Sequence, residues 1–508
     1  MPLEEGTIRT YESLSCIKSS AFHSSIKPFL RSDLMHSIDV DSVENSLDLI
    51  YKINKRISQN DSLSKSKNDT FSYRFIEVSP LFFLHSGYEN GDTERAFSGS
   101  AIGAMVNASF GKKVFFSADF TTANSGFPNF IQQFADSTGV VPSSAHSFST
   151  KAGSHYKTFS GYFSYSPSHF FNFQLGHGKN FWGEGYRSLL LSDVAPNYSY
   201  FKITSGFWKI KYVNLFANFK DVRQPYKDYW HFKNKFGTFH YLSWHISPSI
   251  DAGLFESVIW QAKDTLNSRG YDVNYLNPVI FYRPVEYSLG SADNSLIGLN
   301  LRFKITNHFQ VYSQLIVDEF LVKEVRANNG WWANKYGGQL GFKYFDAFGL
   351  KGFFLQSEFN EVRPYTYSHG STLQNYAHFN QPLAHPLGAN FSEVLGIMRY
   401  TVRNFSFEIK SVISRQGTDS AGKNFGGDIY QSYNSIPQQY GNKTGQGVST
   451  VLMFNEANAS FLIYPKLNLK IEIGALSRTK YVQNHSFHTL YFWAGIKTSL
   501  YNLYRDFM

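Results

Sequence analysis

Apolar and polar residues alternate with a period of two along most of the chain after Ser72. The clearest run is Leu467–Ala475, in which aliphatic side chains share one face and Asn468, Lys470 and Glu472 share the other. This period is typical of a β-strand with one apolar face. A soluble β-sandwich shows the same pattern. The runs here span about 9–13 residues, the length of a tilted transmembrane strand, and therefore favour a membrane barrel.

The alternating runs predict about eighteen strands, and single-chain bacterial barrels have an even number. The runs lie at residues 72–84, 98–109, 113–122, 156–165, 169–178, 198–208, 211–221, 235–245, 249–260, 296–305, 308–320, 336–345, 350–362, 393–402, 404–414, 455–463, 467–478 and 487–500.

Short and long connections alternate between these runs. The long connections lie near residues 123–155, 179–197, 261–295, 363–392 and 415–454, and turns of a few residues separate them. Outer-membrane barrels keep short turns on the periplasmic side and long loops outside. We therefore predict an all-β fold, an antiparallel transmembrane barrel over residues 71–508 with long extracellular loops.

Residues 1–70 have a different pattern. Within residues 41–58, apolar side chains recur at helical spacing, which predicts one amphipathic helix. We expect a small N-terminal periplasmic segment whose helix packs on the periplasmic mouth of the barrel. The first residues lack a secretory signal, which would have a basic start followed by an apolar core. We therefore expect either a mature chain with an added Met or a misplaced start.

Composition agrees with a barrel and narrows the chemistry. Aromatic residues make up 18% of the 508 residues, although the mean hydropathy is −0.30. Strands that face lipid on one side and water on the other give this combination. The sequence contains no run of 18 apolar residues, so it predicts no transmembrane helix. The single cysteine, Cys16, excludes an internal disulfide framework and argues against a cysteine metal site.

The formal net charge is +9, which allows two interpretations. In the first, the surplus lysine and arginine side chains contact anionic lipopolysaccharide or acidic capsule. In the second, they only keep the loops hydrated. The sequence has no basic patch or motif typical of nucleic-acid binding, so we expect no nucleic-acid partner.

One stretch, residues 176–197, concentrates aromatic rings, cations and carboxylates in a glycine-rich connection. Its segment Phe181–Pro196 reads FWGEGYRSLLLSDVAP and resembles the signature of the capsule-assembly Wzi family of outer-membrane β-barrels. Family members usually have Trp-Gly-Pro-Gly here, and Glu184 stands in the proline position. Tyr275–Phe281 with Asp293-Asn294, and His385–Glu393, resemble the Bacteroidota branch that includes the gliding-motility proteins called RemB.

The resemblance implies an outer-membrane barrel that binds and anchors capsular or exopolysaccharide at the cell surface. Aromatic rings stack on sugars, and charged or amide side chains bond sugar hydroxyls. We place these residues on external loops. The candidate polysaccharide-binding residues are Trp182, Glu184, Tyr186, Arg187, Asp193, Asn197, Arg283 and Trp331. Tryptophans near strand ends have a second interpretation as an interfacial girdle.

Enzyme motifs are absent from the sequence. It contains no Gly-x-Ser-x-Gly, no His-Glu-x-x-His and no phosphate-binding loop. Asp318 and Glu319 are adjacent on a strand, so their side chains point to opposite faces and form no facing acid pair. We predict that the protein is not an enzyme and needs no cofactor or metal. The alternatives are an outer-membrane protein of gliding motility or secretion that binds a protein partner, a diffusion channel and, last, an outer-membrane enzyme.

Overall fold

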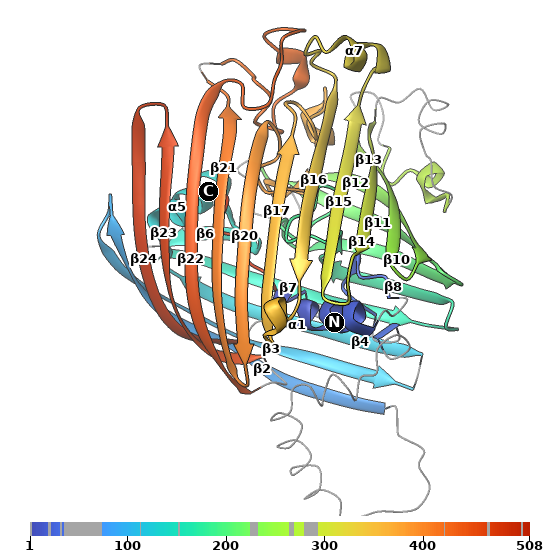
Figure 1. Cartoon of the computed structure of the whole chain (residues 1–508), viewed down its shortest axis with the longest axis vertical. Coiled ribbons are helices and arrows are strands. Elements are labelled where there is room, and N and C mark those ends of the chain that lie inside the picture. Colours follow the sequence, from blue (N-terminus) through green and yellow to red (C-terminus); the bar gives the residue numbers. More distant parts are fainter. Residues whose placement is uncertain are drawn as a thin grey trace, which may run out of the picture.

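The computed structural model describes residues 3–18, 22–30, 33–34, 74–111, 113–150, 153–223, 232–263, 269–278, 293–420, 422–464, 468–498 and 501–508. Within these residues the chain forms a closed barrel of 18 antiparallel strands (Figure 1). The strands, in chain order, are β2 (Arg74–Gly91), β3 (Arg95–Phe110), β4 (Val114–Ser125), β7 (Gly153–Tyr165), β8 (Phe171–Gly178), β10 (Tyr198–Phe207), β11 (Ile210–Asp221), β12 (Lys233–Ser247), β13 (Ile250–Gln261), β14 (Asn294–Lys304), β15 (Phe309–Glu319), β16 (Lys335–Tyr344), β17 (Phe353–Val362), β20 (Phe391–Val402), β21 (Phe405–Thr418), β22 (Val448–Tyr464), β23 (Leu469–Val482) and β24 (His485–Thr498).

The barrel closes between its last and first strands. β24 pairs with β2 from Lys497 opposite Phe83 to Thr489 opposite Gly91. Each other strand pairs with its neighbours in chain order, so no strand of the ring is left with a free edge. The predicted fold class is confirmed, and each predicted run overlaps one strand of the ring, although several ends differ, as for β2 and β22.

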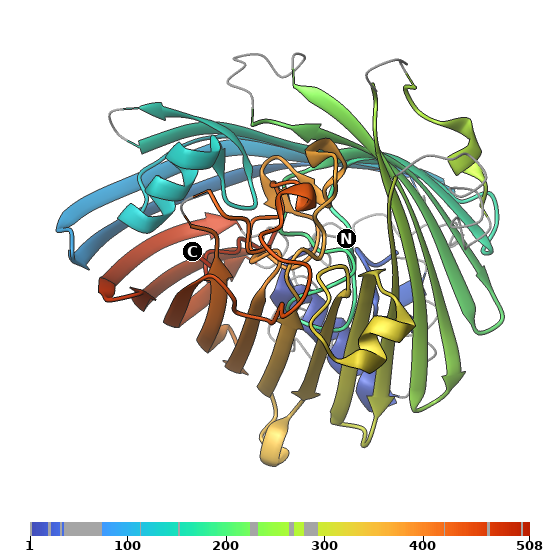
Figure 2. The ribbon, with the colours of Figure 1, turned by 90° about the horizontal axis from the view of Figure 1, so that it is seen from above.

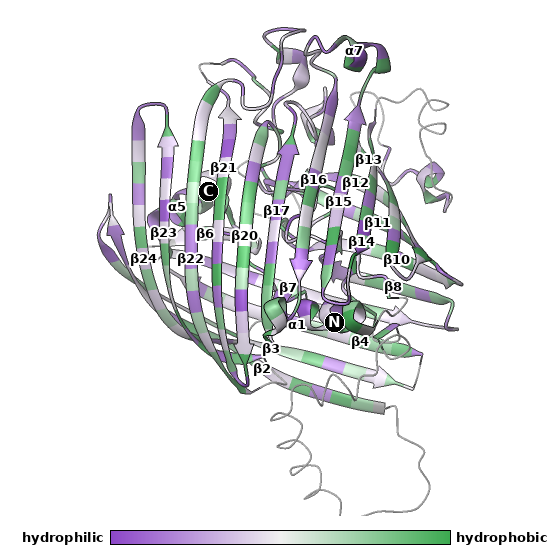
Figure 3. Cartoon of the chain, in the orientation of Figure 1, coloured by the Kyte–Doolittle hydropathy of each residue, from purple (hydrophilic) through white to green (hydrophobic). Residues whose placement is uncertain are grey.

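Hydrophobic and hydrophilic residues alternate along many strands (Figure 3), and successive side chains of a strand point to opposite faces of the wall. On β23, Ile471 and Ile473 are 48% and 58% exposed on the outer face. Lys470, on the inner face of the same strand, lies 3.1 Å from Glu4. The period of two therefore sets the register that we predicted. Among the described residues, no helix is long and apolar enough to cross a membrane.

The described part of the N-terminal segment lies inside the ring (Figure 2), towards the short-turn end (Figure 1). Helix α1 (Glu5–Lys18) buries Ile8 in an apolar cluster with Phe22, Phe29 and Phe181. Its charged face meets the wall, where Arg9 lies 2.9 Å from Glu408. Ion pairs of this kind make it possible to bury a charged helix inside a barrel.

This arrangement differs from the predicted periplasmic segment over residues 1–70. Its described part, residues 3–18, 22–30 and 33–34, lies within the barrel because wall residues supply partners for its charges. The predicted helix over residues 41–58 lies outside the described residues.

Other short elements lie in the connections. β1 (Ile26–Lys27) pairs with β9 (Phe181–Trp182), and β18 (Ala377–His378) pairs with β19 (Gln381–Pro382) inside the barrel. The long-loop end carries α5 (Asn129–Thr138), β5 (Val140–Val141), β6 (Ala145–Thr150), α7 (Val322–Ala327) and the 3-10 turns Val273–Leu276, Thr372–Gln374 and Tyr433–Ser435. The turn Ala347–Gly349 lies at the short-turn end.

Candidate functional site

The segment Phe181–Pro196 lies inside the barrel, so the prediction that it is an external loop is wrong. We call it the plug segment. It forms β9 at its start, and its side chains between Phe181 and Pro196 are buried. The run Leu189–Leu191 enters the main apolar core, where all three residues are fully buried. This apolar run and the ionic partners described below explain why the segment folds inward.

Trp182 packs inside the plug and is 0% exposed. Its ring stacks on Tyr241 with 5.4 Å between ring centroids, and it meets Phe239 and Phe255 edge-on. Its flat faces are therefore covered by aromatic neighbours and are not open to a sugar.

Arg187 forms the ionic centre of the plug segment, and its side chain is fully buried. Its Nε lies 3.2 Å from Glu393, and its Nη2 lies 2.9 Å from Asp506 in the C-terminal tail. Burial by itself would lower the pKa of Arg187, but Asp506 and Glu393 raise it well above its usual value. The guanidinium therefore stays charged and joins three distant parts of the chain.

The other acidic and phenolic candidates of the plug segment also have internal partners. Glu184 accepts a hydrogen bond from the Ser24 hydroxyl at 2.8 Å. Tyr186 donates to Asp506 at 2.8 Å, and Asp193 accepts from the Tyr504 hydroxyl at 2.7 Å. The plug segment thus contacts both ends of the chain.

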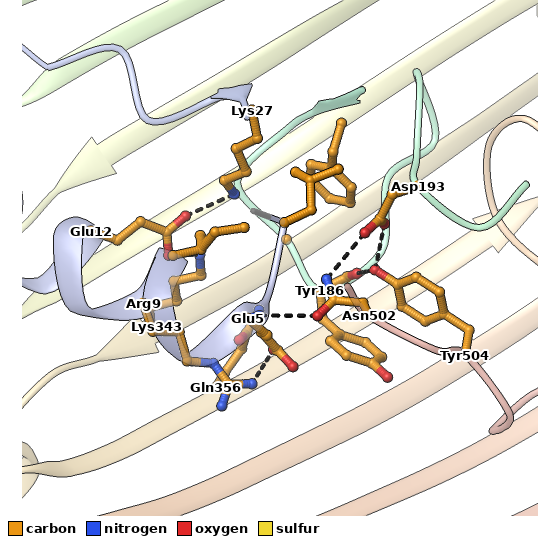
Figure 4. Close-up of a pocket in the computed structure, with 14 residues that line it drawn as sticks. Glu5, Arg9, Glu12, Lys27, Tyr186, Asp193, Lys343, Gln356, Asn502 and Tyr504 are labelled. Carbon is orange, nitrogen blue, oxygen red and sulfur yellow. Dashed lines mark hydrogen bonds and ion pairs between the residues drawn. The ribbon is translucent and has the colours of Figure 1, made fainter. Parts of the chain in front are cut away.

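A small cavity of about 30 Å³ lies between α1, the plug segment and the tail (Figure 4). Tyr186, Asp193 and Tyr504 line it from one side, and Glu12 and Lys343 line it from the other. Burial by itself would raise the pKa of Glu12, but Lys27 and Lys343 lower it to about 2. The cavity has room for a water molecule or two, and not for a sugar.

The remaining candidates lie apart from this group. Asn197 is half-buried beside β10 and donates to the Phe159 carbonyl at 2.7 Å. Trp331 is half-buried at the long-loop end. Arg283 lies outside the described residues. The structure therefore brings together Trp182, Glu184, Tyr186, Arg187 and Asp193, and it separates Asn197 and Trp331 from them.

Two of the sequence segments that carry the family resemblance meet in space. His385 Nε2 lies 2.8 Å from Glu393, and Glu393 in turn holds Arg187 of the plug segment. In the remaining segment, the Tyr275 hydroxyl donates to Asp293 at 2.7 Å. In the part of the chain that the structure describes, these motif residues hold the interior together.

Sequence reasoning missed an aromatic cluster at the long-loop end. Trp332 lies 5.0 Å from Tyr433 and 6.1 Å from Tyr365 between ring centroids, and Trp331 lies beside it. The Lys335 ammonium lies 4.7 Å from the centre of the Tyr433 ring. We call these residues the rim cluster. The adjacent tryptophans were visible in the sequence, but their contact with Tyr365 and Tyr433 joins three separate loops.

No group of His, Cys, Asp and Glu side chains suited to a metal ion occurs among the described residues. The chemistry that they offer is aromatic stacking, hydrogen bonding and ion pairing.

The closed 18-strand ring with a plug inside it defines a plugged β-barrel of the outer-membrane type. No family model and no curated protein sequence matches the chain. It is similar in structure to Wzi, an outer-membrane protein of Escherichia coli, with a TM-score of 0.59 and 11% identity over 98% of this chain and 99% of that chain. Pseudomonas aeruginosa OprD matches with a TM-score of 0.44 and 10% identity over 82% of this chain and 94% of that chain. At 11% identity, the likeness to Wzi establishes the fold.

Proposed function

We propose that the protein is an outer-membrane barrel that binds surface polysaccharide, such as capsule or exopolysaccharide, through its long-loop end. A bacterial outer membrane suits the outer wall, where apolar side chains such as Leu175, Leu340 and Ile473 are 57–64% exposed. In this setting the short turns face the periplasm and the long loops face outward. Lipid and lipopolysaccharide then surround the wall.

The rim cluster is the observation that carries this proposal. It places the half-buried rings of Trp331, Trp332 and Tyr433 at the end of the barrel that faces outward, and aromatic rings with nearby polar groups suit sugar recognition. Wzi, the similar structure, is described as a carbohydrate-binding barrel involved in capsule assembly. The Bacteroidota branch suggested by the sequence stays a prediction.

The plug segment has a different part in this proposal. Its candidate residues are buried and bonded to other parts of the chain, so they position the loops and do not contact polysaccharide. Within the original candidate set, we assign sugar contact to Trp331, and we add Trp332 and Tyr433. The sequence left a packed and a ligand-facing role open for Trp182, and we assign it the packed role.

The test removes the rim tryptophans and measures cell-associated against shed polysaccharide. Trp331→Ala combined with Trp332→Ala should shift polysaccharide into the medium at normal surface levels of the protein. Trp208→Ala is the matched control, since Trp208 is 75% exposed at the short-turn end. Equal retention in both variants would overturn the proposal.

A protein partner is the second candidate function. It is favoured by exposed apolar side chains at and beside α7, where Phe320, Leu321, Val322 and Val325 are 43–50% exposed. Exposed apolar patches mark interaction surfaces. Loss of a co-purifying protein in a Leu321→Ser and Val325→Ser variant, with polysaccharide retention unchanged, would favour this candidate.

A further inference from the structure

A cavity of about 380 Å³ lies in the lumen beside the plug. The wall strands β2–β4 and β20–β24 line one side of it, and α1 and the C-terminal tail line the other. Its volume falls in the range of small-molecule sites, about 300–1,000 Å³. The plug therefore fills only part of the barrel, and space for a small ligand remains against this wall.

The wall of this cavity has a hollow around Trp493. Across the sheet, Trp493 is paired with Gly474 on one side and with Gly87 on the other, and Asn458 pairs with Gly474 on the next strand. A Cβ atom on Gly474 would come within 2.2 Å of the indole, so the ring covers this glycine and lies against the wall. Trp493 is half-buried and lines the cavity together with Tyr491, so the two rings form the aromatic part of the cavity wall.

A hydrogen bond at the edge of the indole and the ring of Tyr491 hold Trp493 in place. Its Nε1 donates to Glu472 at 3.1 Å, and the same carboxylate accepts from Lys497 at 2.8 Å. Tyr491 stacks on Trp493 with 4.9 Å between ring centroids and 19° between ring planes. The hollow thus presents a fixed aromatic surface bordered by a carboxylate and an ammonium group.

Further polar groups line the cavity. His85 is 7% exposed and lines the cavity, and its Nδ1 has no hydrogen-bond partner among the described residues. A buried polar atom left unpaired costs about 1–3 kcal/mol. The side chain of Asn458 also lines the cavity and is half-buried. A ligand with several hydroxyl groups would satisfy such atoms.

The charges that line the cavity balance, which favours a neutral ligand. Six cations face six carboxylates, and most of them form ion pairs with one another. The cations are Lys179, Arg399, Lys410, Lys470, Lys497 and Arg505, and the carboxylates are Glu4, Glu5, Asp119, Glu408, Glu456 and Glu472.

We propose that this hollow is a lumenal subsite for one or two neutral sugar units. A sugar ring has an apolar face of C–H groups, which suits the indole of Trp493, and a rim of hydroxyls, which suits Glu472, Lys497 and Asn458. The inference rests on the proposed function for the source of the sugar, because the subsite would take a short part of the glycan that the rim binds.

The test measures binding of D-glucose and D-galactose to the purified full-length protein in detergent, by calorimetry and by saturation-transfer NMR. Sorbitol is the control probe, because it has the same hydroxyl groups and no ring face. Trp493→Leu should weaken sugar binding by about tenfold or more. Trp244→Leu is the matched control, since its ring is 41% exposed on the outer face.

A second variant keeps the proposal testable if Trp493→Leu fails to fold. Asn458→Ala leaves the aromatic surface in place and should weaken sugar binding several-fold, with heat-modifiable gel mobility reporting the folded barrel. Equal binding of glucose and sorbitol, or equal binding by the Trp493 and Trp244 variants, would overturn the subsite.

The outcomes separate this inference from the proposed function. No binding of either sugar to the unaltered protein, together with polysaccharide shedding by the rim variant, would overturn the subsite and leave the surface function in place. Sugar binding lost in Trp493→Leu, with normal retention by the rim variant, would support the subsite and overturn the surface function.

Discussion

Arg187 and Asp506 form an ion pair of 2.9 Å in which both side chains are fully buried. Arg187 belongs to the plug segment, and Asp506 lies in the tail after β24, where Lys410 and Tyr186 also contact it. A buried charge without a partner costs several kcal/mol. The plug segment and the tail therefore depend on each other for their positions in the lumen.

This dependence predicts a large effect of removing Arg187. Arg187→Met should lower the free energy of unfolding by about 3–5 kcal/mol, because Asp506 and Glu393 lose a shared buried partner. Thermal unfolding of the purified barrel in detergent measures this. Arg403→Met is the control, since Arg403 is exposed in a short turn, and it should change stability by less than about 0.5 kcal/mol. Similar unfolding midpoints for the two variants would contradict the prediction.

The same pair predicts a dependence of stability on pH. Burial by itself would raise the pKa of Asp506, but Arg187 and Lys410 lower it well below the ordinary value of 3.8. A carboxyl whose pKa is lower in the folded state stabilises that state above its ordinary pKa. This contribution is lost as the pH falls through the pKa of the folded state.

Asp506→Asn should therefore lower the unfolding midpoint by a constant amount from roughly pH 5 to pH 8. The difference from the unaltered protein should shrink as the pH falls well below 3.8. Asp136→Asn, at an exposed position on α5, serves as the control. A difference that keeps its size in strong acid would show that Asp506 acts through packing and not through its charge.

The register of β23 predicts opposite responses from neighbouring residues. Ile471 is 48% exposed on the outer face, so Ile471→Arg places a charge against lipid at a cost of roughly 2–4 kcal/mol at mid-bilayer. Lys470 faces the lumen and pairs with Glu4, so Lys470→Ala should still assemble. Heat-modifiable gel migration of outer-membrane fractions distinguishes the two. Equal assembly of both variants would contradict the register.

The occupied lumen predicts low conductance. The plug segment, α1 and the tail lie inside the ring, and the cavity beside them has a volume of about 380 Å³. Planar-bilayer recordings should therefore show no steady pore of the size typical of a porin with about 16–18 strands. Stable, large channels in the unaltered protein would favour the diffusion-channel alternative.

The alternation of side chains, together with the lengths of the runs and of the connections, was enough to predict the barrel. Along β23, the neighbours of Ile471 and Ile473 in sequence are Lys470 and Glu472, and this order alone assigns the outer and inner faces. The pattern is local, because within each strand the apolar residues mark the lipid-facing side and the polar residues mark the water-facing side. The length of each connection shows at which end of the barrel that connection lies. The strands of the ring were therefore predictable before any contact was known.

The contents of the lumen were decided only by tertiary structure. Helix α1 was not predicted, because its apolar and charged residues find their separate partners, the cluster around Phe22 and the charged wall residues, only in the folded barrel. Arg187 looked like an exposed sugar-binding residue, because its partners Glu393 and Asp506 lie far along the sequence. In the sequence, a charged loop residue that is hydrated by water cannot be told from one that pairs with a distant carboxylate. Only the closed barrel, which excludes water and brings those carboxylates within reach, determines which of the two it is.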